Sequence, residues 1–148
     1  MLTFSGLFGD NAVARPPIII NRLDAERLQR LIDNADKQDM PVAEALETEL
    51  ERCEQVEPEN VPADVVSMNS SVTFTDIKRH KQMTRTLVYP HALAGNDNGL
   101  SVMAPIGAAL LGLKVGSTID WDLPSGEQIC LRVDALLFQP ESAGQYHR

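Results

Sequence analysis

The chain has 148 residues, 43% of them hydrophobic, and a formal net charge of −8. This length suffices for one ordinary core, or for a small core with a helical appendage. No apolar run approaches the roughly 18 residues of a membrane-spanning helix. Duplex nucleic acid is a poor direct partner, because binding it relies on basic surfaces that release counterions.

The two cysteines, Cys53 and Cys130, lie far apart in the sequence and predict no disulfide. Together with the three histidines they lack the short paired spacing that is typical of a zinc site, so we expect no structural metal. This use of cysteine fits a reducing cytoplasm. Residues 1–15 lack the basic start and cleavage site of a secretion signal, and we predict a flexible extension there.

Two short amphipathic helices are predicted between residues 16 and 57. Asn21 is a suitable N-cap, and apolar residues then recur at helical spacing up to Ala35. A second helix begins at Met40 and Pro41 and carries an apolar stripe as far as Cys53. The two stripes predict an antiparallel helical hairpin, since neither helix would be stable alone. About 14 residues per helix, at roughly 1.5 Å each, give an arm about 20 Å long.

A composition change at residues 58–62, which include two prolines, predicts a linker. Beyond it, Pro105 begins one short helix and Gly112 supplies the left-handed residue that ends it. Apolar alternation predicts an antiparallel sheet, and therefore an α+β class, for this half of the chain. The expected strands are residues 65–74, 85–89, 100–103, 117–123 and 128–138, followed by a tail at 141–148.

The order of these elements resembles the C-terminal domain of the Gre family of bacterial transcript cleavage factors. The sequence Ala-Leu-Leu-Gly-Leu-Lys-Val-Gly at 109–116, an alternating strand and Leu-Pro-Ser-Gly at 123–126 carry the resemblance. Further segments are similar to a short branch of that family, the regulators of nucleoside diphosphate kinase: 18–21, 23–27, 64–70, 85–90 and 100–105. The likeness runs from residue 16 to residue 142. It implies a short antiparallel coiled coil over 16–57 and an FKBP-like domain over 63–140.

The resemblance also implies a protein that binds RNA polymerase and is not itself an enzyme. Such a protein would dock at the secondary channel of bacterial RNA polymerase and insert its acidic arm. It would compete with the cleavage factors without cleaving RNA, as a cytoplasmic monomer that meets nucleic acid only within the polymerase complex. Nucleoside diphosphate kinase would be affected through transcription, because the chain has no phosphate-binding glycine loop of its own.

The alternative is a metal-assisted transcript cleavage cofactor. In cleavage factors, acidic residues at the tip of the arm help to hold a catalytic Mg²⁺, and in this chain the corresponding end carries Asp33, Asp36 and Asp39. These aspartates are either metal ligands or solvated capping residues. Length favours the second interpretation, because a cleavage-factor arm is about twice as long as the one predicted here. We expect no bound cofactor.

Three sets of residues are candidate polymerase contacts. The family's Asp-Ser-Pro run before the short helix corresponds to Met103, Ala104 and Pro105, of which only the proline agrees. This apolar edge docks on the rim helices, or else Met103 is buried and Pro105 simply begins a helix. The other two sets are the acidic face of the arm, Glu44, Glu47 and Glu51, and the basic cluster Lys78, Arg79 and Lys81.

The basic cluster, which also includes His80, has two interpretations. It meets an acidic patch or a phosphate in the polymerase complex, or it is a solvated turn. An FKBP-like shape also raises the possibility of prolyl isomerase activity, which requires an aromatic pocket. Phe74 and Trp121 fall on alternating core positions, so ordinary packing explains them better. No residue is assigned a catalytic role.

Overall fold

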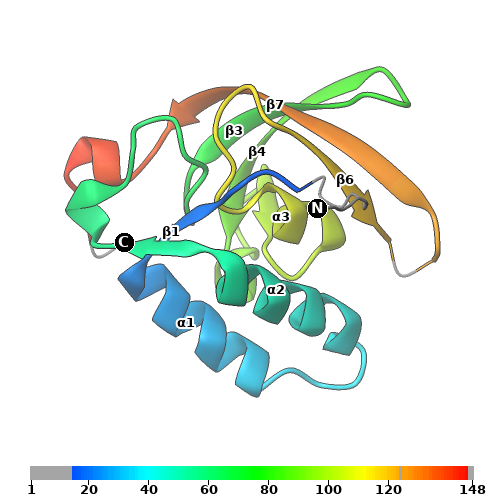
Figure 1. The fold of residues 1–148 in the computed structure, drawn as a ribbon, viewed down its shortest axis with the longest axis horizontal. Helices are drawn as coiled ribbons and strands as arrows, with labels where there is room; N and C mark the ends of the chain where they lie inside the picture. The colour runs from blue at the N-terminus through cyan, green and yellow to red at the C-terminus, as the bar shows by residue number, and fades with distance from the viewer. Residues whose placement is uncertain (1–14, 124, 147–148) are drawn as a thin grey trace, which may run out of the picture.

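The computed structural model describes residues 15–123 and 125–146. Over these residues the chain forms a five-stranded sheet, a two-stranded sheet and three α-helices (Figure 1). The predicted N-terminal extension, except Arg15, lies outside the described residues, as do Pro124 of the predicted hairpin turn and the last two residues of the predicted tail.

Helix α1 spans Arg22–Asp33 and helix α2 spans Met40–Arg52. Asn21 caps α1, because its side-chain oxygen accepts a hydrogen bond from the Asp24 backbone N–H at 2.7 Å. The two helices lie side by side and are joined by a short loop (Figure 1). We call these helices and their loop the helical pair. Both begin where the sequence predicts, while their description as a coiled-coil arm stays a prediction.

Two short strands flank the helical pair. Strand β1, Ile19–Asn21, pairs in parallel with β2, Glu54–Val56. Parallel neighbours need a long crossover connection, and the helical pair is that connection. The Ile19 N–H also donates a hydrogen bond to the Gly112 carbonyl at 3.1 Å. The chain therefore enters and leaves the helical pair at adjacent points on the body of the molecule.

The larger sheet has the strand order β5-β4-β3-β7-β6. Its strands are β3, Ser71–Asp76; β4, Lys81–Val88; β5, Gly99–Ser101; β6, Thr118–Asp122; and β7, Gln128–Phe138. The prediction of a purely antiparallel sheet is wrong at one edge, where β5 runs parallel to β4. The segment between those two strands is a crossover containing the 3-10 turn Pro90–Ala92, not a tight hairpin.

The predicted strand at 65–74 is also shorter than expected, because β3 begins only at Ser71. Val66 and Met68 are buried as the alternation indicates, yet both lie outside the strand: Val66 in an irregular segment and Met68 in a turn. Asn69 in that turn has φ of 67°, which breaks the extended backbone. Burial alone therefore produced the alternation before the strand begins.

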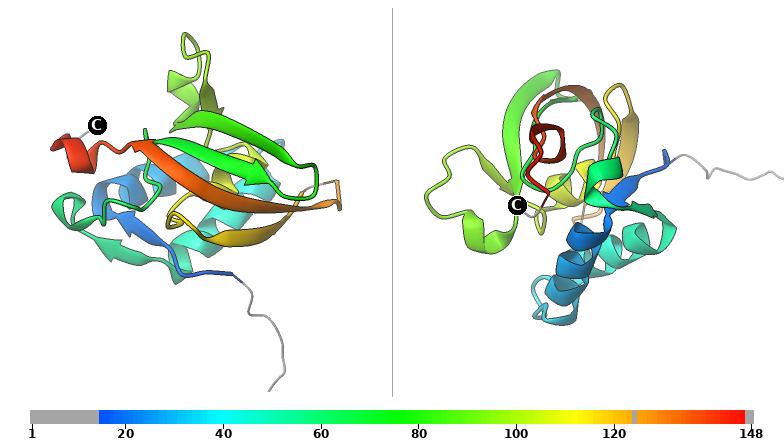
Figure 2. Two further views of the ribbon diagram at one scale, coloured as in Figure 1. Left: turned by 90° about the horizontal axis from the view of Figure 1, so that it is seen from above. Right: turned by 90° about the vertical axis from the view of Figure 1, so that its left-hand side faces the viewer.

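The sheet curls around helix α3, Pro105–Leu110 (Figure 2). Inward-facing residues of β6 and β7, such as Ile119 and Leu131, pack against the helix, while their neighbours Thr118 and Arg132 are exposed. Gly107 allows this close approach: a Cβ there would lie 2.1 Å from the Ser101 carbonyl oxygen. The mixed α+β class is confirmed.

The helical pair packs on the same core. Ile18 and Ile20 before α1, Leu28 of α1 and Leu46 of α2 are buried in one cluster with the inward-facing residues of the sheet and α3. Helix α2 also contacts α3 directly. The division into an arm at 16–57, a linker at 58–62 and a domain from 63 stays a prediction.

Candidate functional site

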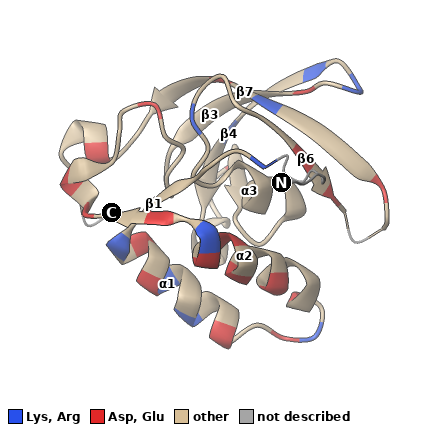
Figure 3. Cartoon of the chain, viewed as in Figure 1, with Lys and Arg blue, Asp and Glu red and all other residues tan. Residues whose placement is uncertain are grey.

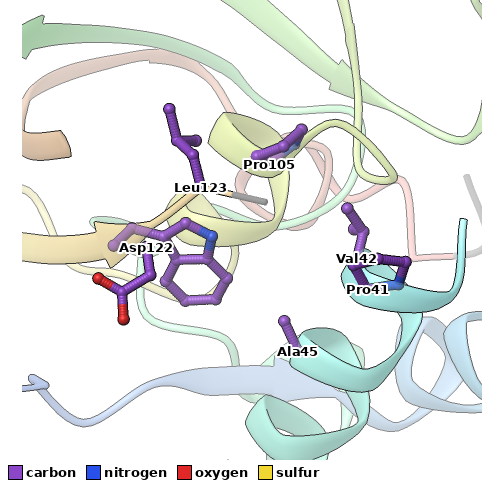
Figure 4. Close-up of a pocket in the computed structure, with 7 residues that line it drawn as sticks. Pro41, Val42, Ala45, Pro105, Asp122 and Leu123 are labelled. Atoms are coloured by element: carbon purple, nitrogen blue, oxygen red, sulfur yellow. The ribbon is translucent and has the colours of Figure 1, made fainter. Parts of the chain in front are cut away.

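A hollow of about 110 Å³ lies where α2, α3 and β6 meet (Figure 4). Pro41, Val42 and Ala45 of α2 line one side, Pro105 lies at the start of α3, and residues 121–123 at the end of β6 complete it. Both prolines occupy first-turn helix positions, where the missing N–H has no cost. The hollow therefore brings a predicted polymerase contact, Pro105, next to apolar residues of the helical pair.

Trp121, which lines this hollow, also contacts the Arg15 side chain. The Arg15 guanidinium lies 4.5 Å from the Trp121 ring centroid and also donates a hydrogen bond to Glu49 at 3.1 Å. Arg52 donates two further hydrogen bonds to Glu49, each 2.8 Å long, and one to the Pro16 carbonyl. Glu49 is only 2% exposed, so its two arginines supply the charge compensation that burial requires.

The other two residues of the apolar edge precede Pro105 in a turn. The backbone N–H groups of Met103 and Ala104 both donate hydrogen bonds to Ser101, at 3.0 and 2.9 Å. Ala104 is the N-cap of α3, and Met103 is half-buried against the core. The edge formed by Met103, Ala104 and Pro105 is thus held rigidly beside the hollow, and its role as a contact stays a prediction.

The basic cluster lies in the turn between β3 and β4, which projects from one end of the sheet away from α3 (Figure 3). Arg79 donates hydrogen bonds to Asp76 at 3.0 Å and to Glu127 at 2.7 Å. Burial acts to raise the pKa of Asp76, but these contacts with Arg79 hold it below the ordinary value. The Lys78 ammonium donates a hydrogen bond to the Gln128 carbonyl, and Lys81 is exposed.

The tip of the helical pair is built from its own hydrogen bonds. The Asp33 carboxylate accepts one from the Gln29 amide at 3.0 Å, and Asp36 accepts one from the Asp39 backbone N–H at 3.1 Å. In the described part of the chain, no group of three or more Asp, Glu, His or Cys side chains is arranged to hold a metal ion. The predicted acidic face of α2 is exposed and carries Glu44, Glu47 and Glu51.

A buried polar cluster joins the helical pair to the sheet, and sequence reasoning missed it. The cluster consists of Asn21, Asp24, Ser67, Tyr89 and Glu141. The Asp24 carboxylate accepts hydrogen bonds from the Tyr89 hydroxyl at 3.0 Å and from the Asn21 amide at 3.1 Å. Glu141 accepts hydrogen bonds from Asn21 and Ser67, both 2.6 Å long. The residues of this cluster come from four distant parts of the sequence, so no local sequence pattern predicts the cluster.

The two carboxylates of this cluster are 3% and 8% exposed. Burial raises the pKa of Asp24 to about 6; the Tyr89 hydrogen bond opposes that rise, and the nearby negative charge of Glu141 adds to it. The guanidinium of Arg27 lies 3.8 Å from Asp24 and compensates only in part. The region that connects helices to sheet is therefore sensitive to protonation.

Two family models match different parts of the chain. Residues 61–135 match the family model for "Transcription elongation factor, GreA/GreB, C-term", and residues 16–56 match the model for "Rnk N-terminus". The regulator of nucleoside diphosphate kinase of Escherichia coli (strain K12) is 48% identical over 134 residues, which cover 90% of this chain and 98% of that protein. The chain belongs to the Gre family, in the branch of the regulators of nucleoside diphosphate kinase.

Two further relatives support the assignment of this Gre-family chain. The transcription elongation factor GreA of Syntrophomonas wolfei is 34% identical over 82 residues, which cover 55% of this chain and 52% of that one. The solved structure of a prokaryotic transcription elongation factor GreA/GreB from Nitrosomonas europaea is 39% identical, with a TM-score of 0.66 over 84% of this chain and all of that one. The predicted family is confirmed. Among the described helices, none has the length and apolar character needed to cross a membrane.

Proposed function

We propose that this chain is a transcription regulator that binds bacterial RNA polymerase at its secondary channel and displaces Gre cleavage factors without cleaving RNA. Its membership of the Gre family supports the choice of partner, since the relatives are named as transcription elongation factors. It meets nucleic acid only inside that complex and acts as a cytoplasmic monomer. An effect on nucleoside diphosphate kinase follows from altered transcription, without a direct kinase contact.

The length of the helical pair carries the proposal. Helices of 12 and 13 residues, at about 1.5 Å per residue, reach only about 20 Å. The tip carboxylates of Asp33 and Asp36 also accept hydrogen bonds from within the helical pair, from Gln29 of α1 and from the Asp39 backbone N–H. A short arm of this kind fills the channel entrance without carrying carboxylates to the catalytic metal, so it competes but does not cleave.

Two surfaces supply the contacts. The rigid edge at Met103, Ala104 and Pro105, with the hollow beside it, offers an apolar step on which a helical hairpin of the polymerase rim packs. The outward glutamates of α2 face the basic wall of the channel. The basic cluster supplies a second contact. Its positive charge there comes from Lys78 and Lys81, since the charge of Arg79 is balanced by two carboxylates.

A competition experiment on purified core RNA polymerase tests the proposal. A cleavage factor is bound first, this protein is titrated, and displacement and transcript cleavage are both measured in backtracked complexes. We expect displacement without cleavage. Cleavage by this protein alone would instead establish the metal-assisted cofactor, with the tip aspartates as its metal ligands, and absence of binding would reject the polymerase as partner.

A charge-reversed variant identifies the arm as the competing element. Replacing Glu44, Glu47 and Glu51 by lysine should weaken displacement by at least about tenfold, because three exposed attractive charges become repulsive. The matched control reverses three exposed acids outside the arm: Glu59, Asp64 and Asp97. Equal weakening by both triple variants would show a general effect of net charge and would contradict a contact by the arm.

A further inference from the structure

A second hollow, of about 280 Å³, lies between α1 and the segment that follows β4. It is lined by Arg27, Arg30, Leu31, Asn34, Tyr89 and His91. It shares no lining residue with the hollow at Pro105. Its size lies just below the range for small-molecule sites, about 300 Å³ and upward, which suits a compact ligand.

The hollow carries positive charge in an acidic protein. Arg27 and Arg30 both line the hollow and no Asp or Glu is among its lining residues, although Glu26 and Asp33 lie about one turn from Arg30 on the same side of α1. The C-terminal end of α1 has a partial negative charge of about one half, which opposes an anion. The Arg30 guanidinium opposes this partial charge, together with that of Arg27, which also lies 3.8 Å from the Asp24 carboxylate. The Asn34 amide donates a hydrogen bond to the Arg30 carbonyl at 2.8 Å.

The opposite wall presents a flat ring. Tyr89 and His91 are stacked, with ring centroids 6.0 Å apart and ring planes only 7° from parallel. The Tyr89 side chain is buried, and its hydroxyl is fixed by the hydrogen bond to Asp24. At 6.0 Å between centroids the two parallel rings are offset, so the exposed His91 imidazole keeps face area that a further aromatic ring can cover.

From this juxtaposition we propose that the second hollow binds a mononucleotide, with the base stacked on His91 and the phosphate held by Arg27 and Arg30. The guanidinium fork matches phosphate oxygens in geometry and charge. A free aromatic ring without phosphate would use only the stacking wall, and inorganic phosphate would use only the arginines. A nucleotide engages both walls at once, and so does the terminal nucleotide of an RNA strand.

Isothermal titration calorimetry on the full chain tests the site with AMP, adenosine, inorganic phosphate and a 5′-phosphorylated RNA trinucleotide. We expect saturable AMP binding at least about tenfold tighter than binding of either adenosine or phosphate, because each of these lacks one of the two contacts. RNA binding tighter than AMP binding would support the same site and identify an RNA end as its natural occupant. Phosphate binding as tight as AMP binding would reduce the hollow to a general anion site and overturn the proposal.

Two single variants locate the binding. Arg30→Gln and His91→Ala remove one exposed side chain from each wall, and each should weaken AMP binding by roughly five- to tenfold. Lys114→Gln removes the same charge as Arg30→Gln from an exposed turn outside the hollow and should leave affinity unchanged. Absence of saturable AMP binding, or unchanged affinity in both wall variants, would overturn the proposal.

Discussion

At the residue scale, Asp24 makes the stability of the protein respond to pH near neutrality. Its pKa of about 6 in the folded protein lies above the ordinary value of 3.8, so the folded state binds a proton more tightly than the unfolded state does. Stability from this group therefore rises as pH falls through 6, and the rise ends below the unfolded value. At neutral pH the Asp24 carboxylate is ionised in a buried site, which opposes the docking of α1 on the sheet.

Replacing Asp24 by Asn should remove this dependence. The wild-type protein is expected to gain on the order of 1 kcal/mol in the free energy of unfolding from this group between pH 7.5 and pH 5. Asp24→Asn, which resembles the protonated acid, should be nearly independent of pH in that range. Urea denaturation at both pH values measures the difference, with Asp97→Asn, an exposed acid, as the control. A variant with the same pH dependence as wild type would contradict this role for Asp24.

Gly107 has a different importance, because it sets the distance between α3 and the end of β5. A Cβ at this position would approach the Ser101 carbonyl oxygen to 2.1 Å, and the contact atom belongs to the backbone and not to a flexible side chain. Gly107→Ala should destabilise the fold by roughly 2 to 4 kcal/mol despite the helix preference of alanine. Thermal unfolding checks the effect, and Thr118→Ala on the exposed side of β6 should change stability by less than about 0.5 kcal/mol. An alanine variant as stable as wild type would show that α3 can shift.

At the element scale, the elements with strong local patterns were predictable. The N-cap at Asn21, the proline at the start of α3 and the apolar alternation along β7 each identify an element from a few neighbouring residues. The strands β1 and β2 escaped prediction because each has only three residues and its partner lies about 35 positions away. The parallel direction of β5 escaped prediction for another reason, since strand direction depends on the path of the crossover.

The two hollows show the same limit. Pro105 was predicted as a contact from its motif, whereas its proximity to Val42 and Trp121 depends on how the helical pair packs on the sheet. Arg27 and His91 carry no joint signal in the sequence, because 64 positions separate them and only the fold brings them to one hollow. Neighbouring residues in the sequence indicate local chemistry, but they do not indicate which distant residues line the same hollow.

At the scale of the whole molecule, the helical pair and the sheet share one hydrophobic cluster. Leu28 and Leu46 of the helices are fully buried in it together with Phe74 and Leu131 of the sheet. Residues with a common core lose their packing together, so the two parts should unfold as one unit. The chain is therefore expected to behave as a single cooperative body in spite of its two matched sequence segments.

Coincident unfolding transitions test that expectation. Trp121 is the single tryptophan and reports on the packing of β6 beside α3 and α2, while far-ultraviolet circular dichroism reports mainly on the helix content of α1 and α2. Both signals should give the same urea midpoint, and Leu46→Ala should lower both equally, by roughly 2 to 5 kcal/mol in unfolding free energy. Thr48→Ala on the exposed side of α2 is the control. Separate midpoints would show two independent folding units.

The pairing of β1 with β2 allows the length of the helical pair to vary without a change in the rest of the molecule. Neighbouring strands in a sheet lie only about 4.8 Å apart, so everything between them is in effect an insertion at a single point of the body. Whole helical turns, each about 5.4 Å, can be added or removed at the tip without changing the strand register at the base. Reach is therefore an adjustable quantity in this architecture, and a regulator and a deeper-reaching factor can be built on one body by changing the length of an insert.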